Sequence, residues 1–450
     1  MRAFTSRIEQ QPLMTVFIAA LVIRMANLSL LQGHDAFFAE IDAITYWSLG
    51  ARLAARETFW PTFLSMTEVM PLYPLLLAGV QIMFGDTPRI AALIQAVIDA
   101  GTCALIAALG AMVSPRTGLV AGVVAAMSAT LIVYSTQILT DTLFLFFFAM
   151  MLLAGAHFLK TPTASCALLA GLAGGFSLAT RPAVSLLLVA AIPVVFTASF
   201  ARRRVFTPAL AASVLFTIGS AVPISPVFLR NIFYYQSGNL TTQTSEYLAF
   251  WIVPLVTTRA SGTPYQTSVD RMQALYHERL AERGLRAETN PFRLSAAKTE
   301  LAREQMALLP LFAYVKSWAE GMVVNLGAPA LLGDPRVRAL PKPSFYNTPG
   351  VTLWDKTRAY IFDDPGLYQV LLILGLVSMI PFLALEAAGI FMLGRTLPWA
   401  AVFSGGVLSY FLMVSGPIAS AKYRLPMEPV LIVLCAIPLA ALFRKSSEAV

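Results

Sequence analysis

Long apolar runs constrain this chain more than any other feature of its sequence. Runs of about 20 residues, the length of helix that crosses about 30 Å of hydrocarbon, recur from near the beginning of the chain to its end. Only 12% of the 450 residues are charged, whereas roughly a quarter are charged in a typical soluble domain. Because so few charges cannot cover soluble cores of this size, we predict an all-α polytopic membrane protein.

The apolar runs predict a bundle of about ten transmembrane helices, one for each run of sufficient length. The expected spans are 14–32, 89–112, 117–136, 140–159, two short helices within 165–198, 205–228, 365–391, 397–415 and 427–443. The stretch 165–198 is divided at Arg181-Pro182, because proline disfavours a helical conformation at the residue before it. The run 71–84 is too short to span, so it is expected to be re-entrant or interfacial.

Basic residues beside short loops predict the orientation, since such loops remain on the cytoplasmic side. The residues expected inside are Arg2, Arg7, Arg116, Lys160, Arg202, Arg203, Arg204, Arg395, Arg444 and Lys445. Both termini are therefore predicted to be cytoplasmic. The net charge of +8 is partly explained by this bias, and no basic soluble domain is present that would bind nucleic acid.

The same topology places acidic and basic residues together on the outer side. The first outer loop, 33–70, contains Asp35, Glu40, Asp42 and Glu68. Asp141 opens a helix there, and the cations expected beside it are Arg181, Arg230, Lys422 and Arg424. Carboxylates and guanidinium groups at one interface suit chemistry on a phosphorylated lipid.

Several stretches at these positions resemble a known family. EIDAITYWSLGARLAARETFWP resembles the first outer loop of bacterial family-39-type glycosyltransferases of the GT-C superfamily. These enzymes are relatives of the protein O-mannosyltransferases and of the lipid A aminoarabinose transferase. The further matching stretches, in the same order, are MPLYPLLLAG, YSTQILTDTLFLFF, SLATRPAVSLLL, PVFLRNIFYY and KYRLPMEP.

The resemblance implies a GT-C-like bundle and a definite reaction. A sugar would be transferred from a polyprenyl-phosphate donor to a lipid, glycan or protein acceptor, with inversion at the anomeric carbon. The protein would lie in the bacterial inner membrane with its active site on the periplasmic face. Its partners would then be the donor, the acceptor and membrane lipids.

The resemblance also suggests the catalytic acids. Asp42 matches the acidic residue of the first-loop motif and is the expected general base, with Tyr46 one helical turn further on. Asp141 matches an acidic position at the start of a family helix. Both acids also fit an ordinary helix cap, and that alternative stays open.

The departing phosphate requires cations. Arg181 and Arg424 match family motifs beside prolines, and Lys422 and Arg230 are further candidates. Each could instead extend its charged group toward lipid headgroups. Tyr46, Glu68 and Tyr73 are expected to contact substrates. For Glu68 the alternatives are a metal ligand and a surface acid, and its position favours the surface acid.

No metal site is expected, because His34, His157 and His277 do not cluster at metal-ligand spacing. We therefore expect no required cofactor, and a divalent ion at the carboxylates stays an open alternative.

The chain is expected to have three parts. Residues 1–230 would form a transmembrane module with the catalytic loop 33–70, and 365–450 would add the C-terminal transmembrane helices. Between them, 231–364 would form an outer-face helical lid or acceptor region, with helices near 268–284 and 293–325. Within it, 307–332 is apolar enough to lie in the membrane interface. The alternative functions are a lipid-linked glycan ligase or polymerase, and a secondary transporter or lipid flippase.

Overall fold

The computed structural model describes residues 2–341, 344–345, 348–350, 352–363 and 365–447. This part of the chain forms helices and no strand. Eight helices are long and apolar enough to cross a membrane, or up to ten if each of two bent pairs forms one span. The spans lie in α1 (Arg2–Leu30), α5 (Pro88–Ala111), α8 (Asp141–Lys160), α10 (Ser185–Arg203), α11 (Phe206–Ala221) with α12 (Ser225–Tyr235), α20 (Leu367–Thr396), α21 (Pro398–Ser415) and α22 (Glu428–Ser447). The predicted all-α polytopic membrane fold is confirmed.

Proline residues and side-chain caps determine where several helices break. α9 (Ala164–Thr180) ends immediately before Arg181-Pro182, and α10 begins after a short 3-10 turn, as the proline predicted. The predicted span 117–136 is not one straight helix: α6 (Pro115–Met127) and α7 (Ala129–Ser135) meet at a 50° bend. Ser128 accounts for this difference, because its hydroxyl caps α7 by accepting the amide of Leu131. The run 71–84 forms the short helix α4 (Leu72–Phe84).

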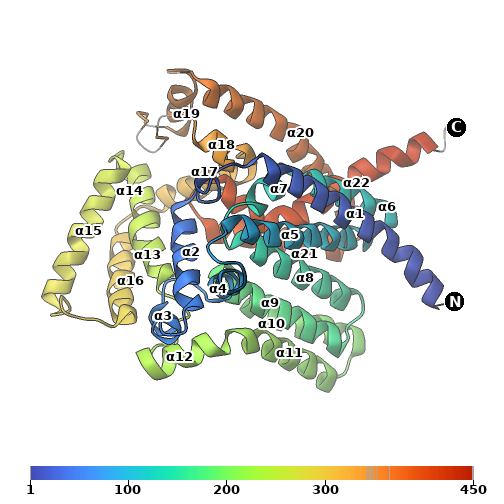
Figure 1. The fold of residues 1–450 in the computed structure, drawn as a ribbon, viewed down its shortest axis with the longest axis horizontal. Helices are drawn as coiled ribbons and strands as arrows, with labels where there is room; N and C mark the ends of the chain where they lie inside the picture. Colours follow the sequence, from blue (N-terminus) through green and yellow to red (C-terminus); the bar gives the residue numbers. More distant parts are fainter. Residues whose placement is uncertain (1, 342–343, 346–347, 351, 364, 448–450) are drawn as a thin grey trace.

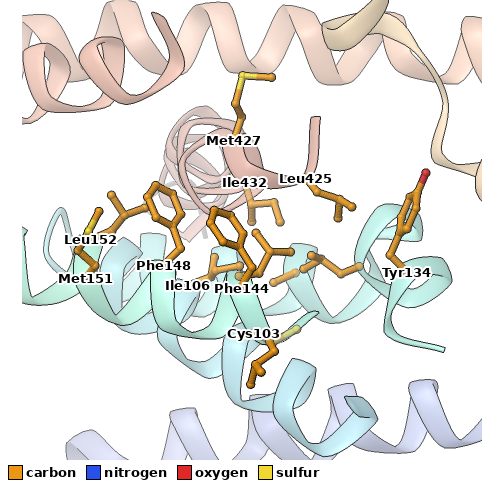
Figure 2. Packing of buried hydrophobic residues seen from close by; sticks show 14 of the residues in the cluster. Cys103, Ile106, Tyr134, Phe144, Phe148, Met151, Leu152, Leu425, Met427 and Ile432 are labelled. Atoms are coloured by element: carbon orange, nitrogen blue, oxygen red, sulfur yellow. The ribbon is translucent and has the colours of Figure 1, made fainter. Parts of the chain in front are cut away.

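Small residues allow neighbouring spans to approach closely. A Cβ at Gly171 on α9 would lie 2.2 Å from the carbonyl oxygen of Phe216 on α11, and one at Gly219 would lie 2.8 Å from that of Leu168. Such contacts between small residues are typical of membrane helices, where hydrophobic burial does not drive helix association. Elsewhere the core is filled by large side chains: Figure 2 shows Phe144 and Phe148 of α8 facing the segment that carries Leu425 and Met427.

A buried ion pair joins α1 to α5. The Nε of Arg24 lies 2.7 Å from the Oδ2 of Asp99, and both side chains are almost fully buried. Arg24 also donates to the carbonyl oxygen of Ala125 at 3.1 Å and to the sulfur of Cys103 at 3.2 Å. Asp99 therefore serves to connect helices within the bundle.

The part of the chain between the two groups of spans is helical and partly polar. Its helices are α13 (Gln243–Tyr247), α14 (Val253–Ser261), α15 (Tyr265–Glu282), α16 (Pro291–Ala307), α17 (Leu311–Gly327), α18 (Pro335–Arg338) and α19 (Leu353–Phe362). The helix predicted at 268–284 is present as α15. The stretch predicted to be helical at 293–325 is helical but divided, because α16 and α17 meet at 111°. Pro310, at the start of α17, has no amide hydrogen for a continuous helix.

The two ends of the bundle differ (Figure 1). α1 begins and α22 ends at one end, whereas α2 (Ile41–Ala54), α3 (Phe59–Ser65) and the α13–α16 group lie toward the other. We call that second end the site end. The side chains of Arg2, Arg7, Arg444 and Lys445, which contribute to the predicted orientation, lie outside the described part.

The close contact of α9 with α11 can be tested by adding one methyl group. Gly171→Ala should lower the apparent Tm of the purified protein, because the new Cβ would collide with backbone. Gly405→Ala on α21 is the matched control, since nothing lies within 4 Å of its position. Alanine favours a helix over glycine by about 1 kcal/mol, so the control should be neutral or stabilising. Equal Tm values for the two variants, measured by heating in detergent, would contradict the packing.

Candidate active site

Two ion pairs of different character lie at the site end. Asp42, in the first turn of α2, lies 3.4 Å from the Nζ of Lys422 in the 3-10 helix η6 (Ala421–Met427). The Asp42 side chain is 61% exposed, so this carboxylate can be reached from solvent. Glu40, at the N-cap of α2, makes no side-chain capping bond, and Asp42 itself is bound to Lys422.

The second pair joins Asp141 to Arg181. Asp141 begins α8 and is completely buried, and its Oδ1 accepts a hydrogen bond from Nη1 of Arg181. Its Oδ2 has no hydrogen-bond partner among the described residues. Thr140 makes no side-chain capping bond, so pairing with Arg181 accounts for Asp141 better than a cap does. Arg181 is held in the extended link between α9 and α10, and its side chain keeps 16% exposure.

Tyr46 of α2 is influenced electrostatically by both pairs. Burial raises the pKa of its hydroxyl, the charge of Asp42 raises it further, and Arg181 opposes this rise. Asp141 acts on the same hydroxyl, so both ion pairs are within electrostatic range of one buried phenol. The fold therefore brings Asp42 and Tyr46 of α2 together with Asp141 and Arg181, which lie far from them along the chain.

Two more tyrosines lie close to Arg181, and sequence reasoning missed both. Tyr247 of α13 and Tyr423 of η6 interact electrostatically with its guanidinium, and their hydroxyl oxygens are 3.2 Å apart. Tyr423 lies inside the KYRLPMEP motif, which was a signal for it. Tyr247 lies in a region without a distinctive motif, so only the tertiary structure reveals it.

Tyr73 was expected to contact a substrate, but it is buried and supports other residues of the site. It is fully buried, and its hydroxyl donates to Oε1 of Gln95 at 2.6 Å. The amide of Gln95 in turn donates to the carbonyl oxygens of Ser135 and Gln137, in the turn that precedes Asp141. The ring of Tyr73 meets that of Tyr46 edge-on at 5.4 Å. Tyr73 thus holds Tyr46 and the Asp141 turn in place.

Arg424 was expected to bind phosphate, and the geometry argues against that role. It is buried, its Nε donates to Oε1 of Glu428 at 2.8 Å, and its other nitrogens bind Glu386 and the carbonyl oxygen of Leu326. Because each of its three nitrogens already donates a hydrogen bond within the protein, Arg424 anchors η6, the segment that also carries Lys422. Glu386 was missed, although an acid inside the apolar span of α20 is a signal of a buried partner.

Arg230 likewise binds other residues of the protein. It donates to the carbonyl oxygens of Phe63 and Met66, each at 2.7 Å, and its guanidinium lies 5.5 Å from the centre of the Phe63 ring. These bonds connect α12 to the end of α3. The expected phosphate contact is therefore not supported for Arg230. Glu68 lies in the next loop and is exposed.

The remaining acids of the first outer loop are separate from this group. Glu40 pairs with Arg338 of α18, and Asp35 is fully exposed beside His34. Within the described ranges, no set of three or more His, Cys, Asp or Glu side chains is arranged to hold a metal ion.

Comparison with known proteins supports the resemblance. Residues 68–228 match the family described as dolichyl-phosphate-mannose-protein mannosyltransferase. The chain is similar to the archaeal oligosaccharyltransferase AglB from Archaeoglobus fulgidus, solved in complex with an inhibitory peptide and a dolichol-phosphate, with 14% identity and a TM-score of 0.50. That match covers 99% of this chain and 52% of AglB, so the chain spans about half the length of that protein.

A further structure is more distant. ArnT from Cupriavidus metallidurans, bound to undecaprenyl phosphate, is 14% identical with a TM-score of 0.36, over 94% of this chain and 77% of that one. No curated protein matches the chain. The similarity to AglB confirms the predicted fold, a polytopic helical bundle of the GT-C type, and the family match covers residues 68–228.

The different roles of Arg424 and Lys422 can be tested without substrate. Arg424→Met would leave two buried carboxylates without their counter-charge, and removing one partner of a buried pair costs about 3–5 kcal/mol. Lys422→Met loses only a pair with an exposed acid, which is worth about 0–1 kcal/mol. Thermal unfolding in detergent should therefore show a large fall in Tm for Arg424→Met and little change for Lys422→Met. The reverse order would show that Arg424 does not anchor η6.

Proposed function

We propose that this protein is a membrane glycosyltransferase that moves a sugar from a polyprenyl-phosphate donor to a lipid, glycan or protein acceptor. One observation carries the proposal: an accessible carboxylate with a lysine and a buried carboxylate with a partly exposed arginine both act electrostatically on the same buried tyrosine, Tyr46. The description of the matched family names a dolichyl-phosphate-linked sugar, mannose, and the AglB structure contains a dolichol-phosphate. Both agree with a polyprenyl-phosphate substrate.

Asp42 is the proposed general base. An acceptor hydroxyl attacks the anomeric carbon, the bond from that carbon to the phosphate oxygen breaks, and the hydroxyl proton passes to Asp42. Attack from the side opposite the leaving phosphate inverts the anomeric centre. Asp42 suits this role because it is exposed enough to meet an acceptor. Asp141 is enclosed and bound to Arg181, so it is better suited to orient that arginine.

Arg181 and Lys422 are the proposed ligands of the donor phosphate. Arg181 uses Nη1 for Asp141, and a guanidinium has further N–H donors in the same plane that can bind phosphate oxygens. Lys422 adds a second positive charge beside Asp42. Positive charge at this place stabilises the phosphate as it departs from the sugar.

The site end is proposed to face the outer side of the bacterial inner membrane, with both termini in the cytoplasm. α1 begins and α22 ends at the opposite end (Figure 1), which agrees with this orientation. The polar helices α13–α16 would then lie outside, next to the site, where an acceptor would arrive.

The assignment of the base predicts a loss of turnover. Asp42→Asn should lower kcat by about 10²–10⁴-fold, because an amide cannot take the hydroxyl proton. Asp35→Asn is the matched control, since this acid lies in the same loop and is fully exposed. Initial rates with a saturating polyprenyl-phosphate sugar would measure both variants. A kcat near that of the wild type for Asp42→Asn would exclude it as the base.

The phosphate assignment predicts weaker lipid binding. Arg181→Ala should bind a polyprenyl phosphate roughly 10- to 100-fold more weakly, because a hydrogen bond to a charged group contributes about 1.5–3 kcal/mol. Arg181→Lys should recover part of this loss, since it restores charge without the planar fork. Arg202→Ala serves as the control, because this exposed arginine lies in the last turn of α10, at the end of the helix away from Arg181.

Binding can be measured by fluorescence anisotropy with a labelled polyprenyl phosphate. Equal affinity for the wild type and Arg181→Ala would contradict the assignment. A wild type that binds only polyprenyl diphosphates would instead indicate a lipid-linked glycan ligase or polymerase.

A further inference from the structure

The helix α17 exposes apolar side chains and buries small and polar ones, which is the reverse of the pattern in a helix that faces water. Its exposed side chains are large and apolar: Leu311, Val315 and Val323 are 77%, 63% and 66% exposed, and Ala319 lies between the last two. These four residues recur every fourth position and form one stripe along the helix, which we call the α17 stripe. A stripe of this kind would be unfavourable in water.

The opposite face of α17 is made of small and polar residues that pack inward. Its buried residues are Ala313, Ser317, Gly321 and Asn325. Gly321 is essential to this packing, because a Cβ there would lie 2.2 Å from the carbonyl oxygen of Gly416 at the end of α21. Small residues inside and large apolar residues outside are typical of helices that contact lipid.

The preceding helices of the same region show the usual arrangement for water. On α15 the buried side chains include Met272 and Tyr276, and the exposed ones include Arg271, Gln273 and Glu278. α16 likewise buries Phe292 and Leu301 and exposes Glu300, Arg303 and Glu304. The pattern changes at the 111° bend between α16 and α17. This bend therefore coincides with a change in the exposed side chains, from polar and charged to apolar.

The surroundings of α17 indicate what covers the stripe. α17 packs on α20 and α21, both of which are candidate spans. The indole nitrogen of Trp318 donates to the carbonyl oxygen of Met413 on α21, and Met413 is itself 59% exposed. α17 thus packs directly against a helix whose apolar surface must meet lipid.

The length and connections of α17 argue against a crossing. Its 17 residues extend about 25 Å, less than the roughly 30 Å of the hydrocarbon core. The segment that follows α17 stays at the site end: Gly333 contacts Tyr134 there, and Arg338 pairs with Glu40.

We infer that α17 lies in one leaflet of the membrane at the site end, with the α17 stripe against lipid acyl chains. From there it holds η6: the side chain of Asn325 donates to the carbonyl oxygen of Ile418 and accepts the amide of Ser420. Leu326 supplies a further acceptor to Arg424. The depth of α17 in the membrane therefore sets the position of the segment that carries Lys422.

Spin-label accessibility tests this inference. Single cysteines replace Val315 or Ala319 in a chain with Cys166→Ala, and the labelled protein is placed in phosphatidylethanolamine–phosphatidylglycerol nanodiscs. Val377→Cys on α20 is the lipid-facing control and Gln273→Cys on α15 the water-facing control, since both positions are exposed. Collision rates are measured with oxygen, which concentrates in lipid, and with a water-soluble nickel chelate.

Labels at 315 and 319 should behave as at 377, with frequent oxygen collisions and few nickel collisions. Nickel collisions as frequent as at 273 would place α17 in water and overturn the inference. Low rates with both reagents would also overturn it, because they would show the stripe covered by protein, such as a second copy of this chain. No step of the test uses sugar transfer, so its outcome is independent of the proposed function.

Discussion

Charges buried in an apolar bundle must be paired, and the arrangement of this protein depends on that constraint. An isolated ion in hydrocarbon costs several kcal/mol, so a helix that carries one must pack where a counter-charge is available. Arg24 with Asp99 fixes α1 against α5 in this way. Arg424 with Glu386 and Glu428 fixes η6 against α20 and α22. The segment η6, which carries Lys422 of the candidate active site, is thus held by the ion pairs of Arg424.

The same principle distinguishes the two acids of the site. Asp141 and Asp42 are both paired with a cation, but Asp141 is enclosed whereas Asp42 is largely exposed. An enclosed carboxylate mainly orients its partner, because it cannot exchange a proton with an incoming molecule. An exposed pair can separate at little cost. The difference in burial, rather than in residue type, therefore suggests which carboxylate meets the acceptor.

The sequence predicted the candidate site only in part. Asp42, Tyr46, Asp141, Arg181 and Lys422 are gathered at one end, as their motifs and the loop charges indicated. Arg424, Arg230 and Tyr73 were also predicted to contact substrates, since each lies in a stretch that resembles the family. Their hydrogen-bonding groups are instead used by Glu386, by the carbonyl oxygens that end α3, and by Gln95. A local pattern shows that a charge is present, but not which acceptors surround it.

The sequence by itself determined the helices and several of their breaks, because hydropathy and backbone chemistry act within a few residues. The apolar runs correspond to helices, and Arg181-Pro182 divides α9 from α10 as proline requires. Only the tertiary structure decided which charges meet, since Asp42 and Lys422 are 380 positions apart. It also decided which face of α17 is buried, because that depends on the backbone of Gly416 and not on α17 alone. Pairing and packing across such separations depend on how the helices assemble, and no short stretch of sequence encodes that.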